Sequence, residues 1–160
     1  MLNKKFLNST LITPAFPNWD RSFVSGPKST LFEVEHRLQS DPIELITHVK
    51  FKPHAEGPPG HIHGGATAGL IDEVMGILVW NQKYPCVTQS LSLKYLKPVP
   101  MNMDTYLVTT IGSISEKTIE VKCTIYNNDK TPYVQAAGVF HRLTQEQLDR
   151  FRSQSGSTAS

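Results

Sequence analysis

The chain has 160 residues and a net charge of +2, with its lysines and arginines scattered rather than clustered. This length suits one domain with a hydrophobic core of its own. The dispersed charge lacks the basic stripe of nucleic-acid-binding proteins, and the longest apolar run, residues 77–80, is too short to cross a bilayer. Neither a nucleic-acid partner nor a membrane span is therefore expected. Cys86 and Cys123 lack the spacing of a zinc or redox motif and are predicted to be buried in strands.

Residues 1–30 are predicted to form an N-terminal arm. Prolines and glycines in "PAFPNW" and "SGPKS" argue against long regular structure there. The first 19 residues contain Lys4 and Lys5 and no acid, but they have neither the apolar block of a secretory signal nor the arginines of a transit peptide. We expect a cytoplasmic location, and any targeting information in the arm is left open.

Residues 31–152 are predicted to form one α+β domain. "TLFEVEHRL" and "IELITHVKF" alternate apolar and polar side chains on either side of "QSDP", which is typical of a β-hairpin. A helix is expected from about residue 65 to residue 80, followed by four strands with period-two alternation. In the first of these strands, Thr88 and Lys94 fall on the polar face, opposite Leu91 and Leu93.

The expected helix is apolar over most of its surface, and such helices are usually buried. An antiparallel sheet of about six strands is therefore predicted to curve around it. Thr144 and Gln147 form a capping-box signal for a short C-terminal helix. Residues 153–160 are predicted to be a disordered tail.

A stripe of small and acidic residues runs along the expected helix. Gly65, Gly69, Asp72 and Gly76 follow one another at spacings of four, three and four, so they share one face. Each interior glycine costs a helix about 1 kcal/mol relative to alanine. Something must therefore approach this face closely, and the candidates are another helix or a ligand.

The start of the helix favours a negatively charged oxygen. His63, Gly64 and Gly65 lie where backbone N–H groups lack partners and the helix dipole is positive, which suits a polarised carbonyl or an oxyanion of acyl transfer. Asp72 lies eight residues beyond Gly64, about 12 Å along the axis, too far to attack a carbonyl held there. A second copy must bring its carboxylate, so a homodimer with antiparallel helices is expected.

The helix acids and the loop histidines each have another interpretation. Asp72 and Glu73 could form an ordinary solvated helix face, although the apolar surroundings favour a functional role. His54, His61 and His63 could form a metal site, but no further Cys or His lies at ligand spacing. No metal is therefore predicted, and loop histidines bonded to the backbone are preferred.

The stretch "EGPPGHIHGGATAGLIDEVMG" closely resembles the signature of hotdog-fold acyl-CoA thioesterases, of the PaaI-like group and especially its thioesterase superfamily member branch. In that pattern, E-G-P-P-G-x-x-H-G-G precedes an Asp nine residues after the His. "VTQSLSLKYLKPVP" resembles the following family strand, in which a hydroxyl residue lies sixteen positions after the Asp and a basic-Pro pair ends the strand. The resemblance covers about residues 31–143 and implies a hotdog fold, with one long central helix wrapped by a curved sheet.

The resemblance also implies an activity: hydrolysis of acyl-CoA thioesters to free acid and CoA. Asp72 would be the catalytic carboxylate, as nucleophile or as base on water. The Gly64 N–H, with His63 beside it, would polarise the thioester carbonyl, and Thr88 would orient water or the carboxylate. No metal or organic cofactor is implied, because coenzyme A enters only as part of the substrate.

Substrate contacts are predicted for Gly65, Lys97 and Lys94, the lysines near the CoA phosphates. A solvated strand end is the alternative for both lysines. His61 stands where relatives often carry an aromatic, and Leu96 replaces a basic residue. A dimer of dimers is left open, as are the acyl group and two rival functions: a hotdog enoyl-CoA hydratase or dehydratase, and a non-catalytic acyl-CoA-binding module.

Overall fold

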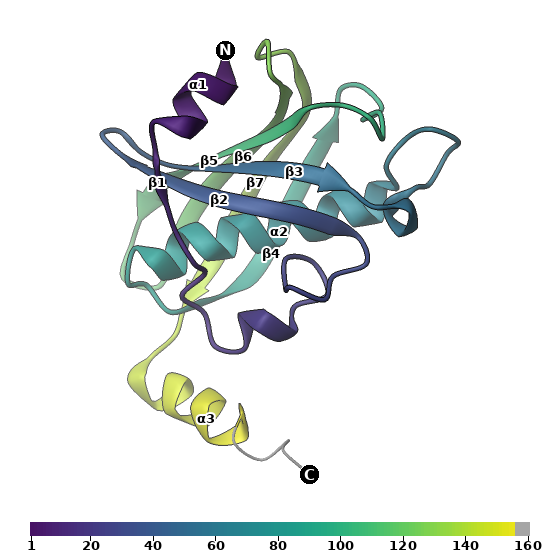
Figure 1. The fold of residues 1–160 in the computed structure, drawn as a ribbon. Helices are drawn as coiled ribbons and strands as arrows, with labels where there is room; N and C mark the ends of the chain where they lie inside the picture. Colours follow the sequence, from purple (N-terminus) through teal and green to yellow (C-terminus); the bar gives the residue numbers. More distant parts are fainter. Residues whose placement is uncertain (156–160) are drawn as a thin grey trace.

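The structure of the protein, a computed structural model, describes residues 1–155 (Figure 1). Within these residues the helices are α1 (Leu2–Leu7), α2 (Gly64–Asn81) and α3 (Gln145–Ser155), with short 3₁₀ helices η1 (Trp19–Arg21) and η2 (Pro53–Ala55). The strands are β1 (Thr10–Leu11), β2 (Phe32–Ser40), β3 (Ile43–Phe51), β4 (Cys86–Tyr95), β5 (Thr105–Ile114), β6 (Thr118–Asn127) and β7 (Pro132–Arg142).

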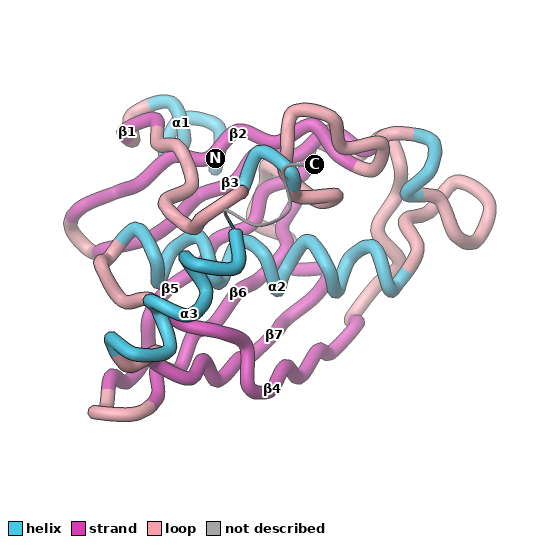
Figure 2. Tube along the Cα trace, turned by 90° about the horizontal axis from the view of Figure 1, so that it is seen from below, coloured by secondary structure: helices cyan, strands magenta, loops and turns pink. Residues whose placement is uncertain are grey.

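The strands form one antiparallel sheet in the order β1-β2-β3-β5-β6-β7-β4. Six of them are long and β1 has two residues. Figure 2 shows α2 lying lengthwise across the strands, on the inner side of the curved sheet. The predicted α+β architecture, one long helix wrapped by a curved antiparallel sheet, is confirmed.

Helix α2 fills the centre of the hydrophobic core. Its buried residues lie on several faces, because the sheet encloses the helix: Thr67, Leu70, Ile71, Val74, Met75, Ile77, Leu78 and Val79. The alternating side chains of β6, including Ile119, Val121 and Ile125, complete the same core cluster. Cys86 and Cys123 are both free and buried, in β4 and β6, as predicted.

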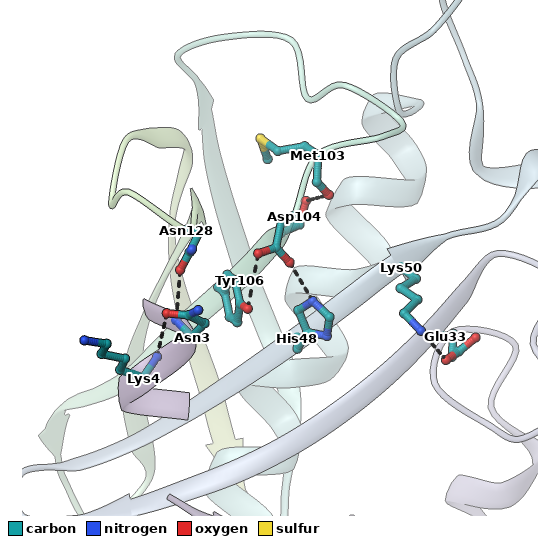
Figure 3. A network of polar contacts seen from close by, with 10 residues as sticks. Asn3, Lys4, Glu33, His48, Lys50, Met103, Asp104, Tyr106 and Asn128 are labelled. Atoms are coloured by element: carbon teal, nitrogen blue, oxygen red, sulfur yellow. Dashed lines mark hydrogen bonds and ion pairs between the residues drawn. The ribbon is translucent and has the colours of Figure 1, made fainter. Parts of the chain in front are cut away.

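The outer face of the sheet carries a second, smaller core built with α1. Leu2 and Phe6 of the helix bury against Ile46 and Tyr106. Asn128 holds the start of α1, since it accepts the Leu2 N–H through its backbone oxygen at 3.0 Å and the Asn3 N–H through its side-chain oxygen at 2.9 Å (Figure 3). The predicted arm, residues 1–30, therefore has only short elements but is fastened to the sheet.

The capping box before α3 is formed as predicted. Gln147 N–H donates to Thr144 Oγ1 at 3.2 Å, and Thr144 N–H donates to Gln147 Oε1 at 2.9 Å. The helix continues to Ser155, three residues past the predicted domain boundary at 152. Of the predicted disordered tail, residues 156–160 lie outside the described part of the chain. Among residues 1–155, no helix combines the length and the apolar character needed to span a membrane.

Candidate active site

The loop before α2 is held by hydrogen bonds to backbone N–H groups and by close packing of its own residues. Glu56 Oε1 accepts the Gly60 N–H at 2.6 Å, and the His63 N–H donates to Ala55 O at 2.8 Å. Gly57 packs directly on His63: a Cβ at residue 57 would lie 2.7 Å from His63 Cα. The breaker residues of the E-G-P-P-G stretch thus fix the loop so that α2 begins in one defined place.

His63 is the N-cap of α2. Its Nδ1 accepts the Gly65 N–H at 2.9 Å, so the proton of the neutral imidazole lies on Nε2. The Gly64 N–H, in contrast, has no acceptor among residues 1–155. Both glycines are exposed. The start of α2 therefore offers a free amide donor at the positive end of the helix dipole.

The free donor lies beside a cavity of about 350 Å³ between the loop, α2 and the end of β4. Gly64, Tyr95 and Lys97 are among its lining residues. The Tyr95 hydroxyl donates to Gly64 O at 2.8 Å, which ties β4 to the first turn of the helix. The ammonium of Lys97 lies 5.7 Å from the centre of the Tyr133 ring. One cation and one amide donor therefore lie on the walls of the same cavity.

Asp72 lies half-buried in the middle of α2. Thr88 Oγ1 donates a hydrogen bond to Asp72 Oδ1 at 2.7 Å, so the hydroxyl holds one carboxylate oxygen in place. Cys86 is also close: burial, and to a smaller degree the charge of Asp72, raises the pKa of the Cys86 thiol to about 12. The Cys86 thiol therefore stays protonated at neutral pH.

A β-bulge turns Thr88 toward Asp72. The β4–β7 register shifts between Thr88 and Ser90, so that Thr88 pairs with Phe140, whose side chain points into the core. Regular alternation would instead group Thr88 with Ser92 and Lys94 on the outer face, which is how the sequence pattern placed it. The period-two grouping of Thr88 is wrong, because an extra residue in the strand reverses the facing of every side chain beyond it. The resemblance, in contrast, placed the Thr88 hydroxyl beside the Asp72 carboxylate, and the structure has this contact.

Asp72 and Thr88 line a cavity of about 410 Å³ with mostly apolar walls. Helix α2 contributes Gly69 and Gly76 to this cavity, and both are small enough to leave room above the helix. Val24 of the same chain lies over Gly69, with Cγ2 3.8 Å from where a Cβ would stand. The glycine stripe thus faces a cavity and the chain's own N-terminal arm.

Within one chain, the structure does not bring the two halves of the predicted site together. Asp72 and Thr88 line one cavity, while Gly64 and Lys97 line the other. Eight residues of helix, or about 12 Å, separate Asp72 from Gly64. The two halves of the predicted site therefore lie apart in a single chain.

Residues 59–133 match the model of the thioesterase superfamily. This part of the chain resembles the thioesterase superfamily. The chain is 33% identical over 91 residues to the acyl-coenzyme A thioesterase THEM4 of Rattus norvegicus. The aligned residues cover 56% of this chain and 39% of that protein. The match thus spans about two fifths of the curated relative.

Solved structures share the fold of this chain. A crystal structure of a thioesterase superfamily protein has a TM-score of 0.68 and 28% identity, covering 74% of this chain and 62% of that one. A hypothetical thioesterase protein with coenzyme A from Streptococcus pneumoniae has a TM-score of 0.65 and 18% identity, covering 71% of this chain and 88% of that one. The predicted hotdog fold is confirmed.

The other predicted site residues lie in two further places. Lys94 lines a depression on the outer face of the sheet, beside Lys122, and is not among the residues that line either cavity. His61 lies with Gly64 in the smaller cavity, and its Nδ1 is 3.0 Å from Pro59 O. Both His61 and His63 are thus bonded to backbone, as preferred from the sequence. Among residues 1–155, no three His, Cys, Asp or Glu side chains gather as metal ligands would.

The sequence pattern missed the residues that surround Asp72 from distant parts of the chain. Phe23 and Val24 come from the arm, and Phe151 comes from α3. Glu73, which was weighed only as a solvated neighbour of Asp72, accepts hydrogen bonds from Ser22 and Ser25. No local spacing signals these contacts, because they join segments about fifty to eighty residues apart.

Proposed function

We propose that this protein hydrolyses acyl-CoA thioesters to the free acid and CoA. The observation that carries the proposal is the hydrogen bond from Thr88 to Asp72 inside a mostly apolar cavity, which supplies an oriented carboxylate beside room for an acyl group. The names of the curated relatives support the substrate class, since they are acyl-coenzyme A thioesterases.

The proposed site is shared between two copies in a homodimer. The thioester carbonyl of the substrate accepts a hydrogen bond from the Gly64 N–H of one protomer, with His63 beside it and Gly65 in the same turn. The carboxylate of Asp72 reaches the acyl carbon from the other protomer. The supporting geometry is the unpaired Gly64 N–H and its separation from Asp72 along one helix. A dimer of dimers is compatible with this arrangement.

In the base route, Asp72 accepts a proton from water as the water oxygen bonds to the acyl carbon. The carbon–sulfur bond then breaks, its electron pair leaves with the CoA thiolate, and the proton returns to the sulfur. In the nucleophile route, an Asp72 oxygen bonds to the acyl carbon and expels the thiolate, and water then cleaves the anhydride. Turnover in ¹⁸O-labelled water separates the two, because water attack on the Asp72 carbonyl leaves label in the protein only by the nucleophile route.

Neither route needs a metal or an organic cofactor, because a thioester is an activated acyl group with a good leaving group. Lys97 is proposed to contact the CoA phosphates, since it lines the Gly64 cavity as an exposed cation. Lys94 remains a weaker proposal because it lies on the outer face of the sheet. A cytoplasmic location stays a prediction.

The runner-up reaction, hydration of an enoyl-CoA, uses a His paired with an acid. Among residues 1–155, His48 and Asp104 form the His–carboxylate pair, with His48 Nε2 2.8 Å from Asp104 Oδ1 (Figure 3). This pair lies outside the lining of both cavities. Asp72 has a hydroxyl partner rather than an imidazole, which favours hydrolysis.

Release of CoA from a series of acyl-CoAs, followed with a thiol-reactive chromophore, tests the proposal. Wild type should release CoA, and Asp72→Asn should lower kcat at least about a hundredfold, the scale of losing an acid/base group. Glu120→Gln, an exposed change on β6, serves as the matched control. Near-normal turnover by Asp72→Asn contradicts the assignment of Asp72. Enoyl-CoA hydration without CoA release, or tight binding without turnover, would replace the proposed function by one of its rivals.

A further inference from the structure

We propose that the arm segment 16–26, fastened to α2 through Glu73, is the wall of the acyl pocket that selects long apolar acyl groups. This inference rests on the proposed function for its substrate. It goes beyond that function by assigning chain-length selection to a segment that lies outside the matched region 59–133.

Glu73 is the fastening point. Its Oε2 accepts a hydrogen bond from Ser22 Oγ at 2.5 Å, and its Oε1 accepts from the Ser25 N–H at 3.1 Å and from the Ser25 hydroxyl. Hydrogen bonds to an ionised carboxylate are stronger than neutral ones, and Ser25 is buried. Glu73 directly follows Asp72 in the chain, so the segment is attached one residue from the proposed catalytic carboxylate.

The segment is shaped to make this contact. Ser22 Oγ also accepts the Val24 N–H at 3.1 Å, which closes a tight turn. Gly26 is required by the same turn, because a Cβ at residue 26 would lie 2.4 Å from Ser22 O. In Figure 1 the loop carrying η1 and the helix α3 both lie below α2, on the side that the sheet leaves open. The arm segment 16–26 therefore forms a folded turn beside α2 rather than an extended stretch of chain.

The turn presents apolar side chains to the cavity. Val24 is buried over Gly69, while Phe23 lines the cavity with 72% of its surface exposed. Phe151 of α3 lines it too, with 49% exposed. When a ligand covers large exposed aromatic side chains on the rim of an apolar cavity, the burial of their apolar surface stabilises the complex. The chemistry of this rim fits a hydrocarbon chain.

The size of the cavity fits the same occupant. Its volume of about 410 Å³ lies within the range of small-molecule sites, about 300–1,000 Å³. A cavity of this size accommodates a chain of several methylene groups beyond the carbonyl. Acyl chains of octanoyl to dodecanoyl size would fill it, whereas an acetyl group would leave the arm untouched.

The first test compares acetyl-, octanoyl- and dodecanoyl-CoA as substrates of the wild type and of two variants. In wild type, kcat/KM should rise along this series. Phe23→Ala and Glu73→Gln should each lower kcat/KM for dodecanoyl-CoA about tenfold, the scale expected for an altered hydrophobic pocket, and should lower kcat/KM for acetyl-CoA by much less. Glu120→Gln is again the matched control. A flat wild-type series, or equal losses on both substrates, overturns the inference.

Glu73 acts here as a positioning residue. Two measurements distinguish this role from a general loss of protein stability. Hydrogen exchange of the Ser25 amide should accelerate in Glu73→Gln, since Glu73 is its acceptor. The double change Ser22→Ala with Ser25→Ala should cause the same selective loss and add little to Glu73→Gln, because both remove one contact. If the losses in kcat/KM from the double serine change and from Glu73→Gln add when combined, the proposal that Glu73 holds the arm through Ser22 and Ser25 is contradicted.

Binding of free dodecanoate, measured by calorimetry, distinguishes failure of this inference from failure of the proposed function. A wild type that hydrolyses no acyl-CoA but binds dodecanoate, more weakly as Phe23→Ala, supports the pocket and contradicts the thioesterase activity. A wild type that hydrolyses acyl-CoAs without preference for chain length and binds no dodecanoate supports the activity and overturns the pocket.

Discussion

Replacing Thr88 by valine should slow the proposed hydrolysis about tenfold. The change keeps the shape of the side chain and removes the hydroxyl that donates to Asp72 Oδ1 at 2.7 Å. A hydrogen bond to a charged group contributes about 1.5–3 kcal/mol. Thr88 is exposed and Asp72 only half-buried, so water can partly replace the hydroxyl and the lower end applies. About 1.4 kcal/mol corresponds to a factor of ten in rate.

The loss should fall on kcat rather than on KM, because an oriented carboxylate matters at the transition state more than in substrate binding. Steady-state CoA release by Thr88→Val and Thr88→Ser measures this, with serine retaining the hydroxyl and most of the rate. The reasoning is refuted if the valine variant keeps full activity, or if the serine variant loses as much as the valine variant.

Two further predictions concern buried titratable groups. Burial lowers the pKa of His36 from 6.5 to about 4, and its Nε2 has no partner among residues 1–155. Below about pH 6.5 the unfolded chain binds a proton at His36, whereas the folded chain does not bind it until about pH 4. The free energy of unfolding should therefore fall by about 3 kcal/mol from pH 6.5 to pH 4. Urea titrations should show a shallower fall in His36→Leu than in wild type or in the exposed control His54→Gln, and equal slopes would contradict the assignment. Burial also raises the pKa of both Cys86 and Cys123 to about 12, so neither thiol should react with a chromogenic disulfide at pH 8 until denaturant is added; rapid labelling of the folded protein would show that the thiols are accessible.

Resistance of the cysteines has a practical consequence for the thiol-release assay. Thiol reagents report CoA without a background from the protein only if Cys86 and Cys123 stay unreactive. Cys86 lines the same cavity as Asp72, so its labelling would also block the proposed acyl pocket. The labelling experiment should therefore precede the kinetic ones.

The elements of the fold could be predicted from the sequence because their signals are local. Helix α2 begins one residue before the expected start at 65 and ends one residue after the expected end at 80. Its apolar residues recur at helical spacing, and the glycines of the preceding loop mark its start. The Thr144 and Gln147 capping box lies within four residues of sequence, and it forms as expected.

Part of the candidate site was also visible in the sequence. The separation of Asp72 from Gly64 follows from helix geometry alone, and the structure places them on different cavities. The backbone-bonded state of His61 and His63 follows from their place in a tight loop. These conclusions depend only on residues close in sequence, whose geometry the helix and the loop fix.

What the sequence determined by itself is the helix, its free amide donor and the place of the carboxylate along it. Only the tertiary structure decided which way Thr88 faces and what covers Gly69. The β4–β7 register inserts a bulge that turns Thr88 inward, and Glu73 draws the arm over the helix through Ser22 and Ser25. The physical reason is that local periodicity is a property of one segment, whereas strand register and long-range hydrogen bonds depend on the partner that the fold brings alongside.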